Sequence, residues 1–140
     1  MHNPAWPLTL YFDGDCPLCA REIALLRRRS SEQRLVLIDI SSPAFDPTST
    51  PFKPEQLQAV LHAQDADGNW LKGLDATYAS WLAADLWQLS WLLAWRPLRR
   101  LLHPLYRLFC WLRPGLTWLP HPDGASRCDR DHCQPPKRQE

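Results

Sequence analysis

Two cysteines near the start of the chain have a spacing that favours thiol chemistry. Cys16 and Cys19 form a C-x-x-C pair within residues 8–22, LTLYFDGDCPLCARE. Thiols one helical turn apart can close a disulfide, and the same spacing supplies two of the four ligands of a zinc site. Asp13 completes the candidate site, either as an acceptor for the Cys19 proton or as a carboxylate that bonds the backbone of its own turn.

The residues around the cysteines predict a strand, a turn and a helix. Apolar and β-forming residues alternate over residues 8–12, and residues 13–15 (DGD) are typical of a turn. Pro17 fits only the first turn of a helix, so Cys16 is expected at the helix N-terminus. Unpaired N–H groups and the positive end of the helix dipole favour a thiolate there, with a pKa of roughly 3.5–7.5 instead of ~8.5.

The predicted helix runs from Cys16 to about Arg29 and has one apolar face. Cys19, Ile23 and Leu26 recur at helical spacing along it. This pattern directs Cys19 towards the core and leaves Cys16 at the exposed tip of the helix.

The acidic residues near the start of this helix have structural interpretations. Asp15 directly precedes Cys16 and is the expected N-cap, although its charge opposes a neighbouring thiolate. Glu22 is expected to be a first-turn partner of the helix dipole. For Asp13, the bond to its own turn is the favoured role, and proton acceptance is the alternative.

Patterns further along the chain predict the rest of a small α/β domain. The apolar run of residues 34–40 fits a buried strand parallel to the first one. Two short runs around a Gly-containing turn fit a hairpin. The expected order β-α-β-α-β-β-α is the minimal thioredoxin-like arrangement, in which a parallel pair of strands joins an antiparallel hairpin. After residue 40 we expect a loop at 41–54, a short helix from Pro54, hairpin strands at 60–66 and 70–72, and a helix at 74–84.

The motif Asp13-x-x-Cys16-x-x-Cys19 resembles the signature of the DCC family of thiol-disulfide oxidoreductases, which are thioredoxin-like. CPLC is also similar to the CPxC site of glutaredoxins, and the resemblance to the DCC family extends from about residue 8 to residue 113. It implies thiol-disulfide exchange. Thioredoxins and glutaredoxins place a cis-proline just before the third strand, whereas Gln58-Ala59 stands there in this chain.

The chain changes character between Trp87 and Leu119. Leucines and tryptophans recur at helical spacing, and residues 86–122 contain five arginines and no acidic residue. We expect extra C-terminal helices with a break before Pro97. Their apolar stripe is either folded over the sheet, the favoured interpretation, or a peripheral contact with a membrane surface. The uncharged run of residues 86–95 is far shorter than the ~20 residues of a membrane-spanning helix.

Composition limits the number of domains and the classes of function. A chain of 140 residues with 45% apolar content fits one thioredoxin-like domain at 1–119 and a polar, proline-rich tail at 120–140, expected to be partly disordered. A net charge of +1 argues against nucleic-acid binding. The first residues lack the pattern of a signal peptide, so a cytoplasmic location is expected.

Redox chemistry at Cys16 and Cys19 is favoured over a structural zinc site. Zinc would need further ligands among Cys128, Cys133 and His132, and the separation of these groups is far from usual zinc-finger spacings. Cys128 and Cys133 are themselves either a second, shuttling dithiol or incidental thiols in the tail.

These observations together predict a thiol-disulfide oxidoreductase. The Cys16 thiolate attacks a substrate disulfide, Cys19 resolves the mixed disulfide, and no bound cofactor or metal is needed. The expected partner is a disulfide-containing or dithiol client protein, or a low-molecular-weight thiol. The alternatives are a non-enzymatic interaction or membrane-surface module on a thioredoxin-like scaffold, with contact through Trp87–Leu119, and a zinc-binding structural domain.

Overall fold

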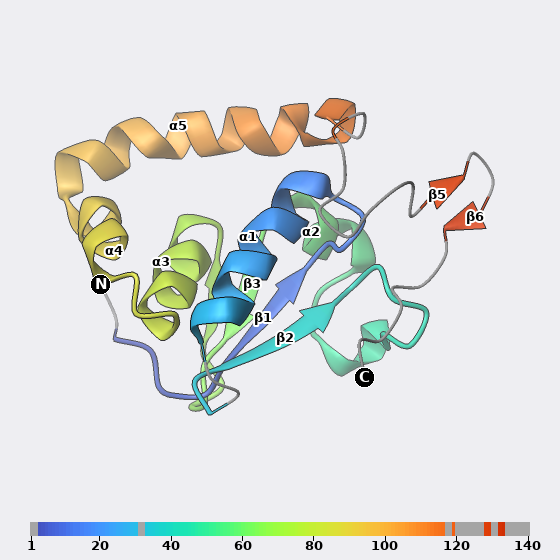
Figure 1. The fold of residues 1–140 in the computed structure, drawn as a ribbon, viewed down its shortest axis with the longest axis horizontal. Helices are drawn as coiled ribbons and strands as arrows, with labels where there is room; N and C mark the ends of the chain where they lie inside the picture. The colour runs from blue at the N-terminus through green and yellow to red at the C-terminus, as the bar shows by residue number, and fades with distance from the viewer. Residues whose placement is uncertain (1–2, 31–32, 117–118, 120–127, 130–131, 134–140) are drawn as a thin grey trace.

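A four-stranded mixed sheet forms the centre of the protein (Figure 1). The computed structural model describes residues 3–30, 33–116, 119, 128–129 and 132–133. Strand β1 pairs in parallel with β2 and antiparallel with β3, and β3 and β4 form an antiparallel hairpin, so the order is β2-β1-β3-β4. The strands are β1 (Leu8–Phe12), β2 (Leu35–Asp39), β3 (His62–Gln64) and β4 (Trp70–Lys72).

The helices follow the strands in the predicted order. From β1 to α3 the chain reads β-α-β-α-β-β-α, which confirms the predicted α/β class and is consistent with a thioredoxin-like arrangement. Two more helices follow α3, as expected for a C-terminal helical extension. The helices are α1 (Pro17–Arg29), α2 (Pro54–Ala59), α3 (Leu74–Ala83), α4 (Trp87–Ala94) and α5 (Arg96–Leu112), with 3₁₀ turns η1 (Pro47–Ser49) and η2 (Arg113–Leu116).

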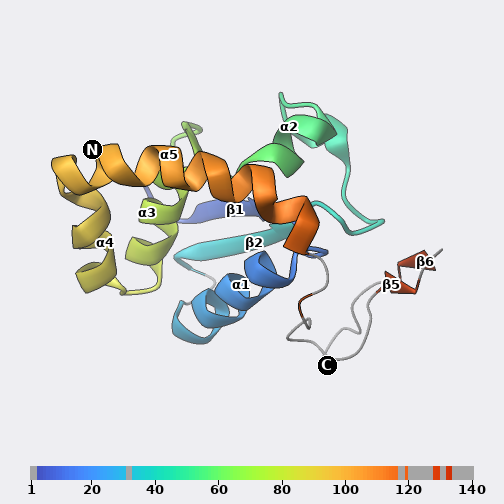
Figure 2. The same ribbon diagram turned by 90° about the horizontal axis from the view of Figure 1, so that it is seen from above.

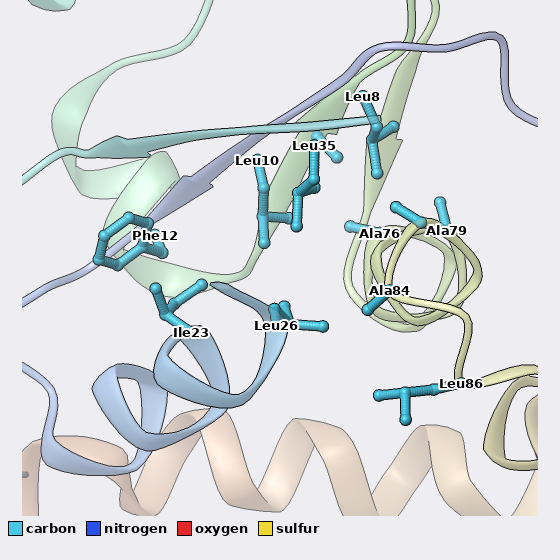
Figure 3. Close-up of a cluster of buried hydrophobic side chains, with 12 residues drawn as sticks. Leu8, Leu10, Phe12, Ile23, Leu26, Leu35, Ala76, Ala79, Ala84 and Leu86 are labelled. Carbon is cyan, nitrogen blue, oxygen red and sulfur yellow. The ribbon is translucent and has the colours of Figure 1, made fainter. Parts of the chain in front are cut away.

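The main hydrophobic core lies between one face of the sheet and the helices α1 and α3 (Figure 3). Leu10 and Phe12 of β1 point to the same face because alternate strand residues do so, and they meet Ile23 and Leu26 of α1. The alanines of α3 present little bulk, so this helix can lie close to the sheet. Burial of each large side chain stabilises the fold by about 1.5–3 kcal/mol, and these contacts hold α1 against the end of β1.

The opposite face of the sheet carries a cluster of aromatic rings. Tyr11 alternates with Leu10 and Phe12 along β1, and its ring centroid lies 5.4 Å from that of Trp70 and 6.5 Å from that of Phe45. Phe45 belongs to the connection between β2 and α2. That connection was predicted to be a loop, and in the structure it contains the turn η1 and covers this second face.

The position of β2 in the sheet differs from the prediction. Its parallel pairing with β1 is confirmed, but β2 lies at the edge of the sheet and is not a buried strand. Leu35 is buried, whereas Val36 is exposed. A continuous apolar run does not distinguish a central strand from an edge strand, because the number of neighbours is set by the fold.

Helix α5 lies across the layer formed by α1 and α3 (Figures 1 and 2). Tyr106 attaches it to the domain, since the hydroxyl of Tyr106 accepts a hydrogen bond from the Leu61 amide at 3.3 Å. Arg99 of α5 also pairs with Asp75 of α3. The break predicted before Pro97 is confirmed, with Trp95 between α4 and α5.

The favoured interpretation of the C-terminal apolar stripe, as core folded over the sheet, is wrong for much of α5. No residue of α5 is buried, and only one side of the helix packs against the domain. Within the described ranges, no helix combines the length and the apolar character needed to cross a bilayer.

The predicted tail is described only in part. Strand β5 (Cys128–Asp129) pairs antiparallel with β6 (His132–Cys133), and Cys128 is the partner of Cys133 in this pairing. The expected disorder of the tail and the roles of the two cysteine side chains lie outside the described residues.

Candidate active site

Cys16 is the N-cap residue of α1. Its backbone is extended (φ −81°, ψ 116°), and its Sγ accepts a hydrogen bond from the backbone N–H of Cys19 at 3.4 Å. The sulfur therefore satisfies one of the N–H groups that a helix leaves unpaired at its start. Pro17 follows at the first helical position, as predicted. The expectation that Asp15 caps the helix is wrong, because the helix begins one residue later.

The surroundings of Cys16 make its thiol acidic. The hydrogen bond from the Cys19 thiol is the largest cause, and the Cys19 amide, the Arg113 guanidinium and the Leu18 amide add to it. Together they lower the pKa of Cys16 from 9.0 to about 6, although burial acts in the opposite direction. At neutral pH Cys16 is therefore largely a thiolate, which is the nucleophilic form of cysteine.

Cys19 has the opposite character. Its hydrogen bond to Cys16 and its burial raise the pKa of the Cys19 thiol, and the charge of the Cys16 thiolate raises it further. The two neighbouring thiols thus share one proton, held on Cys19. A pair in this state has one nucleophilic thiolate and one protonated thiol, which must lose its proton before it can attack.

The exposure of the two cysteines is the reverse of the prediction. Only 6% of Cys16 is exposed, whereas Cys19 is partly buried and was expected to point into the core. The buried face of α1 is formed by Pro17, Ala20, Ile23 and Leu26, so Cys19 lies beside it. The Cys16 sulfur folds back over the helix end to accept the Cys19 amide, and for this reason it does not project as an exposed tip.

Arg113 joins the site from the far end of the chain. Its Nη1 lies 3.8 Å from the Cys19 Sγ, its Nη2 lies 3.1 Å from the Asp13 Oδ2, and it donates to the Gln58 carbonyl. The side chains of Arg113 and Asp13 are only 13% and 20% exposed. The sequence carries no signal for this contact, since Arg113 is one of several basic residues in an amphipathic stretch.

Asp13 makes two contacts with different consequences. Its Oδ1 accepts a hydrogen bond from the Asp15 amide at 3.1 Å, which is the turn contact expected for an aspartate at this position. Its Oδ2 holds Arg113. The structure thus brings all three predicted site residues together and adds a cation to them.

A cavity of about 50 Å³ lies behind Cys19 and is bordered by β1, α1 and α5. This volume suffices for a few water molecules. Cys19, Glu22, Tyr106 and Arg113 line part of it. The site therefore has a partly polar cavity beside the Cys19 thiol.

Glu22 does not have its predicted role as a first-turn partner of the helix dipole. It lies in the second turn of α1 and accepts a hydrogen bond from the indole N–H of Trp81 at 3.0 Å. Burial raises the pKa of the Glu22 carboxyl. Glu22 therefore links α1 to α3 beside the cavity.

The side chains described by the structure include no group of three or more His, Cys, Asp or Glu that could hold a metal ion. The zinc interpretation also requires Cys128, Cys133 or His132, whose side chains are not among those described. The dithiol itself needs no bound group for exchange, since its two sulfurs carry the electrons.

Comparison with known proteins identifies a family and a relative. The DCC1-like thiol-disulfide oxidoreductase family model matches residues 10–119. A protein of Arabidopsis thaliana, named only as uncharacterized and chloroplastic, is 27% identical over 117 residues, which is 82% of this chain and 55% of the relative. The chain therefore spans about half the length of that relative. No solved structure matches.

Proposed function

This chain belongs to the DCC1-like thiol-disulfide oxidoreductase family, and from that premise we propose that it exchanges disulfides through Cys16 and Cys19. The family supports a thiol-disulfide redox role. The assignment of the attacking and resolving sulfurs rests on this chain's own geometry. The observation that carries it is the Cys16 sulfur, which caps α1 and has a pKa lowered to about 6.

In the reductive direction the reaction has two steps. The Cys16 thiolate attacks one sulfur of the substrate disulfide, so a Cys16–substrate disulfide forms and the other substrate sulfur leaves as a thiolate. Cys19 then loses its proton and attacks the Cys16 sulfur. The Cys16–Cys19 disulfide forms and the second substrate thiolate leaves. Two electrons pass from the dithiol to the substrate, and the reverse steps oxidise a dithiol client.

Arg113 fits the second step best. Cys19 has a raised pKa and must become a thiolate before it attacks, and Arg113 places a cation 3.8 Å from its sulfur. A neighbouring cation favours the charged form of a thiol. Asp13 holds this cation in place through its Oδ2. Asp13 as the acceptor of the Cys19 proton stays the alternative role.

The substrate must reach a sulfur that has little exposed surface. With 6% of Cys16 exposed, a slender disulfide fits this opening better than one set in a rigid, bulky surface. We therefore propose either a low-molecular-weight disulfide or an extended segment of a client protein as substrate.

Single cysteine variants test this function. Cys16→Ser should abolish disulfide reduction in an insulin reduction assay, because it removes the attacking sulfur. Cys19→Ser should retain the first step and accumulate a mixed disulfide that mass spectrometry detects. Cys110→Ser is the control, since Cys110 forms a hydrogen bond with the Tyr106 side chain and is not part of the Cys16–Cys19 pair. Full activity of the Cys16→Ser protein would refute the proposal.

A further inference from the structure

Helix α5 carries a second apolar face that packs against no described part of the chain. Leu101, Leu105, Leu108 and Leu112 follow one another at intervals of four, three and four residues, so they lie on one side of the helix. All four are exposed, Leu101 to 67%. The side of α5 that meets the domain is formed by other residues, among them Leu98, Leu102, Tyr106 and Phe109.

Exposed tryptophans lie on α4 and at both ends of α5. Trp95 precedes the first residue of α5 and Trp111 lies in its last turn, where it is 77% exposed. Trp87 and Trp91 of α4 are exposed as well. Tryptophan has an apolar ring with a polar N–H and is the residue that concentrates where hydrocarbon meets water. We define the outer face as these four leucines and four tryptophans.

The charged residues of α4 and α5 are all arginines. Arg96, Arg100 and Arg107 are exposed and have no ion-pair partner among the described residues. Arg99 and Arg113 are paired within the domain. Helices α4 and α5 contain no Asp or Glu. Helices that carry unpaired guanidinium groups and no carboxylates attract an anionic partner, and phosphate oxygens match the guanidinium geometry.

We propose that α4 and α5 bind peripherally to an anionic phospholipid surface through the outer face. A helix of 17 residues is about 25 Å long. It can lie in the interface with its leucines among the acyl chains, its tryptophans at both ends, and its arginines at the phosphates. This arrangement needs no spanning helix, and it uses the apolar face that the fold leaves uncovered.

Vesicle co-sedimentation of the purified 140-residue chain tests this inference. We expect partition into phosphatidylcholine vesicles with 30% phosphatidylglycerol that is at least tenfold stronger than partition into pure phosphatidylcholine vesicles. Raising the salt concentration should weaken it, because salt screens the arginine–phosphate attraction. No partition into the anionic vesicles would overturn the proposal.

Matched variants separate the two components of binding. The triple change Arg96→Glu, Arg100→Glu and Arg107→Glu should reduce partition into anionic vesicles at least tenfold. Leu101→Ser with Leu108→Ser should do the same, because it removes apolar contact while leaving the inner side of α5 intact. The charge control is Arg27→Glu with Arg28→Glu and Arg29→Glu, and the apolar control is Leu25→Ser with Val36→Ser, all of which change residues exposed elsewhere. Both controls should bind like the unchanged chain.

Two further readouts keep the test decisive. All variants should reduce insulin at the unchanged rate, which shows that they fold and that loss of lipid binding is distinct from loss of redox function. Sedimentation velocity measures whether a second copy covers the same face. One result would show that a second copy of the chain, and not a membrane, covers the outer face. In it, the unchanged protein does not bind anionic vesicles but forms a dimer, and Leu101→Ser with Leu108→Ser abolishes that dimer.

Discussion

The Nη1 atom of Arg113 lies 3.8 Å from the Sγ atom of Cys19, although 94 residues separate them in the chain. The contact places a cation beside the cysteine whose pKa is raised, and Asp13 forms an ion pair with that cation. Arg113 also helps to lower the pKa of Cys16. The reactivity of both cysteines thus depends on the end of α5.

Replacing Arg113 by Gln should raise the pKa of Cys16. A neutral amide cannot stabilise the thiolate by charge, and we expect a shift of up to about one unit, a tenfold change in thiolate fraction in that limit. The pH dependence of iodoacetamide reaction at Cys16, or of thiolate absorbance, measures it. Arg107→Gln is the control, because Arg107 is exposed. An unchanged pKa in the Arg113→Gln protein would rule out an electrostatic role.

Asp13→Asn separates the two roles considered for Asp13. If Asp13 acts by holding Arg113, Asp13→Asn and Arg113→Gln should slow resolution of the mixed disulfide by similar factors, and their combination should add little. If Asp13 accepts the Cys19 proton, Asp13→Asn should slow resolution much more than Arg113→Gln does. Stopped-flow kinetics of the resolution step distinguishes these outcomes. Asparagine retains an oxygen for the Asp15 amide, so the turn itself should survive.

The reduced protein should become more stable as pH rises from about 6 to 9. In this window Cys16 has lost its proton in the folded state, where its pKa is about 6, but still holds it in the unfolded chain, where the pKa is 9.0. The stabilisation is complete above pH 9 and is lost as pH falls through 6. Urea unfolding of the reduced protein at several pH values measures this slope. The Cys16→Ser protein should lack it, because serine does not titrate.

Gly73→Ala should destabilise the attachment of α5. Gly73 has a φ of +57°, and a Cβ there would lie 3.2 Å from the Tyr106 Cε1 atom. Gly68→Ala is a matched control, since Gly68 has a φ of +86° but open space around it. We expect each change to cost about 1 kcal/mol from backbone strain, and Gly73→Ala to cost about 1 kcal/mol more in urea unfolding. Equal losses of stability in the two variants would mean that the Tyr106 ring moves away from the added Cβ at no cost in free energy.

Glu22→Gln should stabilise the protein at pH 7 or above. Burial raises the pKa of the Glu22 carboxyl, so the folded state holds this proton more tightly than the unfolded chain. Stability from this group is therefore present at low pH and is lost as pH rises through the folded pKa. Gln removes the charge while its oxygen can still accept the Trp81 N–H, and we expect a higher free energy of unfolding than that of the unchanged chain. Glu22→Leu is the comparison, because it loses that bond.

Local patterns predicted the core elements well. The strand at Leu8–Phe12, the helix that follows Pro17 and the hairpin around Gly68 depend on alternation, proline placement and turn chemistry, all of which act within a few residues. The dithiol was found for the same reason, since Cys16 and Cys19 are neighbours in the chain. Sequence patterns that span only a few residues are therefore enough to predict a strand, a helix start or a turn.

What the sequence missed depends on contacts between distant residues. Whether residues 35–39 form a central or an edge strand depends on which strands pair with them, and the role of Arg113 depends on how α5 crosses the domain. The exposure of Cys16 was misjudged because a helical wheel does not describe a capping side chain that folds back on the helix end. The apolar stripe of α5 was misjudged because leucines at helical spacing do not show which side meets the domain.

The attachment of Tyr106 beside Gly73 sets the rotation of α5 about two turns before Arg113. Inserting or deleting a single residue between them would turn the guanidinium by about 100° and carry it away from both cysteines. The length of this segment is consequently as strict a requirement of the redox centre as the two residues that separate Cys16 from Cys19. Natural length variation is therefore expected to fall before Tyr106 or after Arg113, and not between them.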